Sequence, residues 1–159
     1  MQIKKELIIK FYKLLYDEDL DIKKKYSIFT QIFYDLSGDD AWKVYWITKN
    51  ALKKYSENNF RSIQGIQRAH IVDRIQTLTK IFENKKLDDE TLIITIIEND
   101  KTILMTKEEH GSGNISKKFE IDITQNLFSA QMISYKFRIG HEGVYLRDLY
   151  TKHKEEFFN

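Results

Sequence analysis

The sequence contains neither cysteine nor proline, and it contains no long apolar run. Without cysteine the chain has no disulfide, no thiolate metal ligand and no cysteine nucleophile. Without proline its turns must be made by Gly, Asn, Asp and Ser. No stretch approaches the about 18 apolar residues that a membrane-spanning helix requires, and the mean hydropathy is −0.51. We therefore expect a cytoplasmic protein that has no membrane partner.

Length and composition favour a single folded domain. The chain has 159 residues, of which 42% are hydrophobic and 31% are charged. A chain of this length supports one hydrophobic core but hardly two, and its hydrophobic content is too high for a disordered tail. We predict one domain over residues 1–159, with a helical part at 1–60, a candidate site region at 61–115, and strands and a C-terminal helix at 116–159.

The formal net charge of +2 hides an uneven distribution along the chain. Residues 61–86 carry six Lys and Arg against two Asp and Glu, whereas residues 87–110 carry two against seven. Basic side chains neutralise phosphates, and clustered carboxylates bind cations. The pattern is typical of a polyanion-binding surface beside a cation site. A solvated helix followed by a solvated loop is the alternative interpretation.

Apolar residues recur at helical spacing through the first sixty residues. The pattern predicts three helices, which span residues 3–15, 22–36 and 42–55. The second helix is expected to end at residues 37–40, where a glycine is followed by two aspartates. The third helix carries Trp42 and Trp46, which we expect to be buried because an exposed aromatic stripe promotes association.

The second half of the chain contains short β-branched and alternating segments that are typical of strands. Residues 92–97 and 102–106 are expected to pair as a hairpin. Residues 119–123 and 133–139 alternate as further strands, and a closing helix begins near Val144. The predicted class is α+β, in which N-terminal helices pack on a small antiparallel sheet and a C-terminal helix closes the fold.

His70 lies between two arginines, Arg68 and Arg74, and Asp73 follows it by three residues. Arginines bind phosphate through a planar set of N–H donors, and a neutral imidazole between them can take a proton from water. We therefore predict that His70, Arg68 and Arg74 are catalytic residues for phosphodiester chemistry. The alternative is a half-buried structural histidine on a helix whose arginines face solvent.

A second group of polar side chains follows the predicted hairpin. Glu108, Glu109 and His110 offer oxygen and nitrogen donors. Such donors suit Mg²⁺ or Mn²⁺, with Zn²⁺ as a further option. Lys107 beside them and His141, which lies in a glycine-containing turn, are candidates for binding the substrate phosphate. A charged loop without a metal, and a structural turn histidine, are the alternative interpretations.

Two short segments resemble the His-Me finger, or HNH, group of nucleases. They are Ala69–Ile71 and the later Lys107–His110, and the resemblance covers residues 61–115. In that group a histidine ends the first strand of a hairpin and activates water. A residue on the succeeding helix holds a single divalent cation.

This resemblance implies roles for individual residues. His70 would be the general base, and His110 would be a ligand of the cation. Asp73 or Asp100 would be a second ligand. The implied cofactor is therefore a divalent metal ion, and the implied partner is nucleic acid.

Together these features predict a small metal-dependent nuclease, or a nuclease-like protein, of a mobile-element or defence system. In this hypothesis Arg68, Arg74 and Lys107 position phosphate, His70 activates water, and a cation near His110 stabilises the departing oxygen.

Two alternatives stay open. One is a non-catalytic nucleic-acid-binding or inhibitor protein that uses residues 61–86 as a basic face, which would add a protein to the expected partners. The other is a metal-independent ribonuclease toxin in which His70 or His141 is the acid or base. The three readings differ in whether the chain cleaves nucleic acid and in whether cleavage needs a cation.

Overall fold

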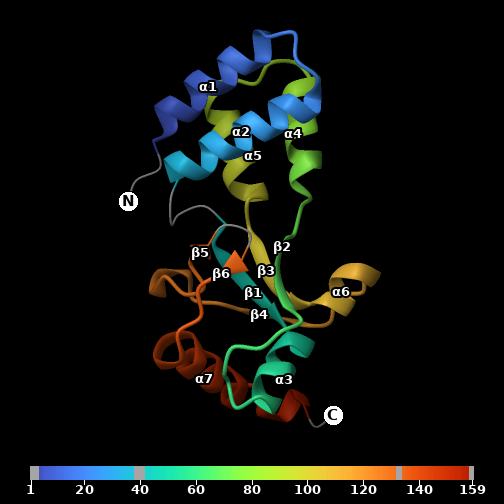
Figure 1. Ribbon diagram of the computed structural model, residues 1–159, viewed down its shortest axis with the longest axis vertical. Coiled ribbons are helices and arrows are strands. Elements are labelled where there is room, and N and C mark those ends of the chain that lie inside the picture. The colour runs from blue at the N-terminus through green and yellow to red at the C-terminus, as the bar shows by residue number, and fades with distance from the viewer. Residues whose placement is uncertain (1–3, 38–41, 132–133, 158–159) are drawn as a thin grey trace. The chain divides into compact units, whose positions relative to one another are not determined.

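The computed structural model describes residues 4–37, 42–131 and 134–157, and Figure 1 shows its helices and strands. The protein belongs to the α+β class and has a C-terminal helix, as the sequence predicts. The chain divides into two compact units. The helical unit consists of Met1–Trp42 and His70–Lys101, and the sheet unit consists of Lys43–Ala69 and Thr102–Asn159. The expected divisions at residues 60 and 115 do not coincide with these units, and a single domain over residues 1–159 stays a prediction.

The described part of the helical unit is built from four helices. They are α1 (Lys5–Asp17), α2 (Ile22–Ser37), α4 (Arg74–Glu83) and α5 (Asp89–Asn99). The first two confirm the predicted helices, whereas residues 38–40 of the predicted helix stop lie outside the described residues. Helix α1 buries Ile8, Tyr12 and Leu15, whose spacing forms one stripe along the helix. This stripe packs with apolar residues of the other three helices into one core.

Helix α5 shows that the strand predicted at residues 92–97 is wrong. The side chain of Asp88 caps this helix by accepting a hydrogen bond from the backbone N–H of Thr91. Asp89 and Glu90 in the first turn interact favourably with the positive end of the helix dipole. Its buried residues are Leu92, Ile93 and Ile96. Capping and packing against the helical core therefore override the β propensity of the isoleucines.

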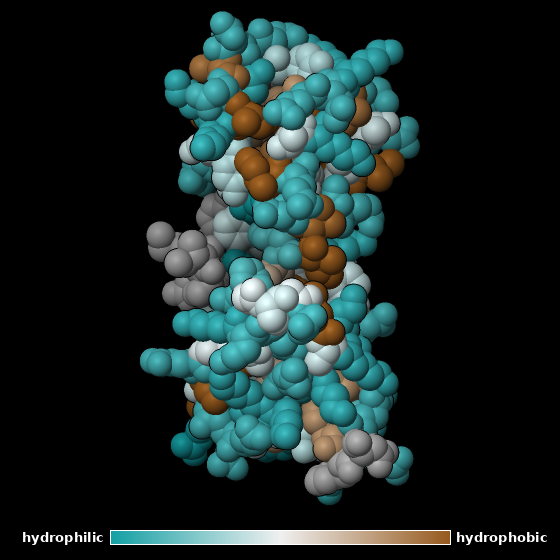
Figure 2. Space-filling view, turned by 90° about the vertical axis from the view of Figure 1, so that its right-hand side faces the viewer, coloured by the Kyte–Doolittle hydropathy of each residue, from teal (hydrophilic) through white to brown (hydrophobic). Residues whose placement is uncertain are grey.

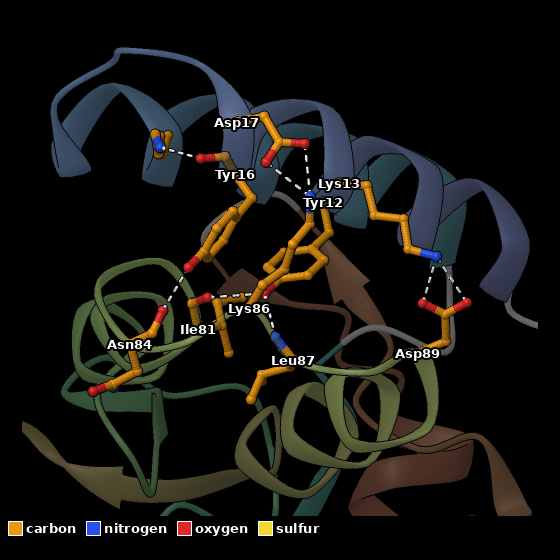
Figure 3. Close-up of polar contacts among 10 residues, drawn as sticks. Tyr12, Lys13, Tyr16, Asp17, Ile81, Asn84, Lys86, Leu87 and Asp89 are labelled. Carbon is orange, nitrogen blue, oxygen red and sulfur yellow. Dashed lines mark hydrogen bonds and ion pairs between the residues drawn. The ribbon is translucent and has the colours of Figure 1, made fainter.

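Polar contacts fasten α1 to α4 and to the segment that links α4 with α5 (Figure 3). The Tyr12 hydroxyl donates a hydrogen bond to the carbonyl oxygen of Ile81 at 3.2 Å and accepts one from the Leu87 N–H at 2.9 Å. The Tyr16 hydroxyl donates to the carbonyl oxygen of Asn84 at 2.8 Å. Two ion pairs lie nearer to solvent, Lys13–Asp89 at 2.7 Å and Lys86–Asp17 at 2.6 Å. Because exposed ion pairs contribute little, the hydrogen bonds of the buried Tyr12 outweigh them among these polar contacts.

The sheet unit is built on a four-stranded sheet with the strand order β2-β3-β1-β4. Its strands are β1 (Val44–Thr48), β2 (Ile66–His70), β3 (Thr102–Thr106) and β4 (Lys118–Glu120). Strand β1 pairs with β3 in parallel and with β4 antiparallel. The Lys107 N–H donates to Gly65 O and the Ile71 N–H donates to Lys101 O, so β2 and β3 run antiparallel. The sheet is mixed, which corrects the predicted antiparallel sheet.

Strand β3 confirms the prediction of a strand at residues 102–106 but not its predicted partner. Residues 92–97 are helical, and β3 lies between β2 and β1 instead. All five side chains of β3 are buried. This burial is typical of an inner strand whose two faces are both covered.

The predicted helix over residues 42–55 is wrong in its first half. Strand β1 is followed directly by helix α3 (Lys49–Glu57). The Thr48 side chain caps α3 by accepting a hydrogen bond from the third residue of that helix. The aromatic and β-branched residues of β1 favour a strand. Trp42 and Trp46 are only partly buried, Trp42 in the helical unit and Trp46 in the sheet unit.

Short elements complete the sheet unit. They are α6 (Lys107–Ser112), the 3₁₀ helix η2 (Ile123–Gln125), β5 (Ala130–Gln131), β6 (Ser134–Tyr135), the π-helix η3 (Ile139–Gly143), α7 (Val144–Lys152) and the 3₁₀ helix η4 (Lys154–Phe157). Helix α7 confirms the predicted closing helix. The strands predicted at 119–123 and 133–139 are largely wrong, because only short parts of each are extended and residue 133 lies outside the described residues.

The surface is mostly hydrophilic on the face that Figure 2 shows. Among residues 4–37, 42–131 and 134–157, large apolar side chains with high exposure include Ile139 (61%), Leu14 (57%) and Ile94 (54%). Single exposed apolar residues of this kind are normal in folded proteins. Among the described residues, no helix has both the length and the apolar character needed to cross a membrane.

Candidate active site

Four side chains meet in the helical unit, and we call them the His70 cluster: Trp42, His70, Arg74 and Asp100. His70 is the last residue of β2, and Asp100 is the C-cap residue of α5. The Nε2 atom of His70 lies 3.4 Å from Oδ1 of Asp100. The His70 side chain is 21% exposed, so the imidazole is held by the protein and still reaches solvent. The fold therefore brings together three of the predicted site residues.

Asp100 is the centre of this cluster. Its Oδ2 accepts a hydrogen bond from the Trp42 N–H at 2.8 Å. Its Oδ1 lies 3.4 Å from both His70 Nε2 and Arg74 Nη2. The Asp100 side chain is only 12% exposed, and a buried carboxylate is stable only when it is paired. These contacts engage both oxygens of Asp100, whereas the buried Nε2 atom of His70 makes no hydrogen bond within the described part of the chain. The role of Asp100 as a metal ligand stays a prediction.

Arg74 lies inside the cluster. Its guanidinium carbon is 4.1 Å from the centre of the Trp42 ring, within cation–π distance, and its side chain is 16% exposed. Burial lowers the pKa of Arg74, and the charge of Asp100 together with the Tyr26 hydroxyl partly offsets that decrease. A guanidinium in this position neutralises Asp100. The predicted role of Arg74 in binding phosphate stays a prediction.

Trp42 belongs to this cluster, although the aromatic pattern of the sequence predicts that it is buried in the core. Its backbone φ is 60°, in the left-handed region that bulky residues rarely adopt. Asp100 holds its N–H, Arg74 lies over its ring, and His70 meets the ring nearly edge-on with centroids 6.2 Å apart. Strained residues persist where their surroundings fix them, and they concentrate at functional sites. No sequence pattern signals a tryptophan in this conformation.

The other predicted site residues are not among the four side chains of the cluster. Asp73 caps α4, since its Oδ1 accepts a hydrogen bond from the second residue of that helix at 3.0 Å. Arg68 is a half-buried residue of β2 in the sheet unit. Lys107 and His110 are exposed on α6, and His141 is exposed in η3. These three residues also belong to the sheet unit.

The residues predicted to hold a divalent cation do not form one group. Within residues 4–37, 42–131 and 134–157, no three His, Cys, Asp or Glu side chains are placed to bind a metal ion. Asp73 is engaged as a helix cap, and Asp100 is engaged by Arg74 and Trp42. His110 belongs to the other unit. The described side chains therefore do not fit a ready-made cation site.

Glu109, a predicted cation donor, is a structural carboxylate that is 4% exposed. One of its oxygens accepts hydrogen bonds from Thr48 Oγ1 at 2.7 Å and from the Thr106 N–H at 3.0 Å. The other accepts from Asn50 Nδ2 and from the Ser116 N–H, each at 3.1 Å. Glu109 also closes the capping box that begins α6. Its carboxylate thus ties α6 to the β1–α3 junction and leaves no oxygen for a cation.

Comparisons of the chain with protein-family models, with curated proteins and with solved structures found no match. The likeness to the His-Me finger group therefore stays a prediction. A functional assignment rests on the residue pattern and on the geometry of the His70 cluster.

Proposed function

We propose that this protein cleaves phosphodiester bonds in nucleic acid and that His70 is the general base. The observation that carries the proposal is the 3.4 Å contact between His70 Nε2 and the buried carboxylate of Asp100. A carboxylate beside one ring nitrogen fixes the tautomer and the orientation of an imidazole, which leaves the other nitrogen to act as the base. The contact is longer than a good hydrogen bond, and such contacts commonly tighten when substrate binds.

In the proposed reaction, Nδ1 of His70 takes the proton of an attacking hydroxyl, which belongs to water or to a ribose 2′ position. The oxygen forms a bond to phosphorus, the bond from phosphorus to the leaving oxygen breaks, and the leaving oxygen takes up a proton from solvent water. The imidazolium that forms on His70 is stabilised by the carboxylate of Asp100. Arg74 and Trp42 hold Asp100 in place through their contacts with its oxygens.

The order of the elements supports a nuclease of the His-Me finger type. Strand β2 ends with His70, β3 pairs with β2 antiparallel, and α6 with His110 follows β3 directly. Helices α4 and α5 are inserted between the two strands. This is the strand–strand–helix order that the resemblance implies. A divalent cation at His110 stays a prediction, and no step is assigned to it because the described residues do not form a cation site.

The distribution of charge supports a second candidate function, because the excess of basic residues belongs to the sheet unit and not to the helical unit that holds the His70 cluster. The sheet unit carries 14 Lys and Arg against 9 Asp and Glu, a net charge of +5, whereas the helical unit carries 12 against 15, a net charge of −3. Residues 43–69 alone carry six basic residues against one acidic residue. Basic surfaces bind phosphate groups regardless of base sequence. The second candidate is therefore nucleic-acid binding through the sheet unit without cleavage.

The predicted basic face at residues 61–86 is divided by the fold. Arg61 and Arg68 belong to the sheet unit, whereas Arg74 and the three lysines of this segment belong to the helical unit. Arg74 forms an ion pair with Asp100, and Lys86 forms one with Asp17. The segment therefore contributes only part of the basic surface that we propose for the sheet unit.

Incubation of the purified protein with nucleic acid tests the proposed function. The substrates are plasmid DNA, single-stranded DNA and single-stranded RNA, each with Mg²⁺, with Mn²⁺ or with EDTA. We expect cleavage of at least one substrate. Cleavage that stops in EDTA supports the cation-dependent form of the proposal, and RNA cleavage that continues in EDTA supports the metal-independent form. Binding without cleavage under every condition overturns the catalytic proposal and favours the second candidate.

A further inference from the structure

The sheet unit contains a surface depression of about 490 Å³ that the proposed reaction does not use. Side chains from η3 and α7 form one wall, and residues at the end of η2 and just after it form the other. Binding sites for small molecules commonly have volumes of about 300–1,000 Å³. The depression therefore has the size of a ligand site, and its lining indicates the chemistry of the ligand.

The first wall is a stripe of side chains along η3 and α7. His141, Val144, Asp148 and Lys152 recur every three or four residues and therefore lie on one face. Asp148 and Lys152 are one helical turn apart, about 6 Å along the axis, and Val144 is about 12 Å from Lys152. The stripe thus offers an apolar segment, then a carboxylate, then an ammonium group.

The second wall is a short segment in a strained conformation. Leu127 lines the depression between Asn126 and Phe128, whose φ angles are 46° and 54°. Residues other than glycine rarely adopt this left-handed conformation, and here two of three successive residues do so. Strain of this kind is retained where surrounding contacts fix the backbone, and it concentrates at ligand-binding and active sites.

A buried carboxylate fixes this strained segment. Glu142, which is 0% exposed, accepts hydrogen bonds from the Phe128 N–H at 3.2 Å and from the Arg138 N–H at 2.7 Å. The Arg138 guanidinium pairs with Glu142 at 2.6 Å and donates to the carbonyl oxygen of Asn126 at 3.3 Å. Burial alone would raise the pKa of Glu142, but the hydrogen bonds from Arg138 and Phe128 outweigh burial and lower it. The wall is therefore held in shape before any ligand binds, which reduces the entropy lost on binding.

We propose that this depression binds a nucleotide, either free or as one residue of a strand. The nucleobase lies between Leu127 and Val144, and the ribose hydroxyls bind the carboxylate of Asp148, the side chain that proteins commonly use for ribose. The phosphate binds the ammonium group of Lys152, one helical turn further on. His141, at the opposite end of the stripe, offers a ring nitrogen to the edge of the base. The net charge of +5 on the sheet unit attracts such an anion.

Titration of the ¹⁵N-labelled His70→Asn variant with nucleoside 5′-monophosphates tests this site by NMR. We expect saturable shifts in residues 125–128 and in α7, with a Kd of about 1 mM or lower. Lys152→Ala should weaken nucleotide binding about tenfold or more, because a charge-assisted hydrogen bond is lost. The same substitution should leave the binding of the unphosphorylated nucleoside unchanged. Lys154→Ala, which removes an exposed lysine two residues further along, should change neither affinity.

Further probes distinguish a free nucleotide from a nucleotide within a strand, and they give the results that would overturn the proposal. A dinucleotide that binds more tightly than the mononucleotide assigns the depression to a strand, and equal affinities assign it to a free nucleotide. The proposal is overturned by the absence of shifts with every nucleotide, by inorganic phosphate binding as tightly as a nucleotide, or by equal effects of Lys152→Ala and Lys154→Ala. Because the variant lacks the His70 base, this result does not depend on whether the protein cleaves nucleic acid.

Discussion

Substitution of His70 by asparagine is expected to lower the cleavage rate by about 10²–10⁴-fold, because the general base is lost. Asparagine retains an N–H donor that can face Asp100, so the cluster should keep its charge balance. We expect the melting temperature to change by no more than about 4 °C, which corresponds to roughly 1 kcal/mol for a protein of this size. His70→Ala should show the same loss of rate with a larger loss of stability, because it also removes the ring that packs against Trp42.

Cleavage assays and thermal melts on the same preparations check this prediction. His153→Gln is the matched control, since His153 contacts Glu156 and Phe119 in the sheet unit. It should cleave at the wild-type rate per folded molecule. If His70→Asn is folded and cleaves as fast as wild type, His70 is not the base. If activity falls only in proportion to the folded fraction, His70 is a structural residue.

Substitution of Glu109 by alanine is expected to lower the free energy of unfolding by about 3 kcal/mol at neutral pH. The carboxylate accepts hydrogen bonds from two backbone N–H groups, those of Thr106 and Ser116, and from side chains at the β1–α3 junction. Removing it leaves several buried donors without an acceptor and removes the capping box of α6. Chemical denaturation followed by circular dichroism measures the loss.

Glu120→Ala is the control for this substitution, because Glu120 is an exposed residue of β4. Its free energy of unfolding should stay close to that of wild type. An equal effect of the two substitutions would show that the buried network around Glu109 adds no stability. Cleavage by the Glu109→Ala protein, measured where it is folded, should persist because Glu109 has no part in the proposed reaction.

The same carboxylate gives a pH dependence whose sign follows from its pKa. Burial would raise the pKa of Glu109, but hydrogen bonds from Ser116, Thr106 and Thr48 outweigh burial and lower it. A folded-state pKa below the unfolded value of about 4.3 means that this stabilisation is complete above that pH. It is lost as the pH falls through the folded-state pKa. Glu109→Gln should therefore unfold with a weaker dependence on acid than wild type.

Elements with a simple amphipathic stripe were predictable from the sequence. Helices α1, α2 and α7 each bury one apolar face, and their spacing alone indicates helix. Helix α5 was not predictable in this way, because its run of leucine and isoleucine residues favours a buried strand just as well. Its Asp88 cap and its packing in the helical core decide the outcome. The sequence does not reveal strand β1, because its parallel partner, β3, lies far away in the sequence.

Individual residues of the candidate site could be predicted from the sequence, but their arrangement in space could not. His70 and Asp100 are each visible as candidates, yet nothing in the sequence places them in contact. The contact depends on α4 and α5, because these two helices bring Lys101 back beside Ile71. There the Ile71 N–H donates a hydrogen bond to the carbonyl oxygen of Lys101. No sequence pattern predicts the strained backbone of Trp42, because contacts with Asp100 and Arg74 hold its φ angle.

The central claim is that Asp100 acts through His70, and a double-mutant cycle on the cleavage rate tests it most directly. Asp100→Asn keeps an oxygen for the Trp42 N–H but loses the charge that orients His70, so we expect a rate about 10–100-fold below wild type. Residues that act as a unit have strongly non-additive effects. The protein with both Asp100→Asn and His70→Asn should therefore cleave no more slowly than His70→Asn alone, with rates taken per folded molecule. Losses that multiply in the double variant would contradict the account.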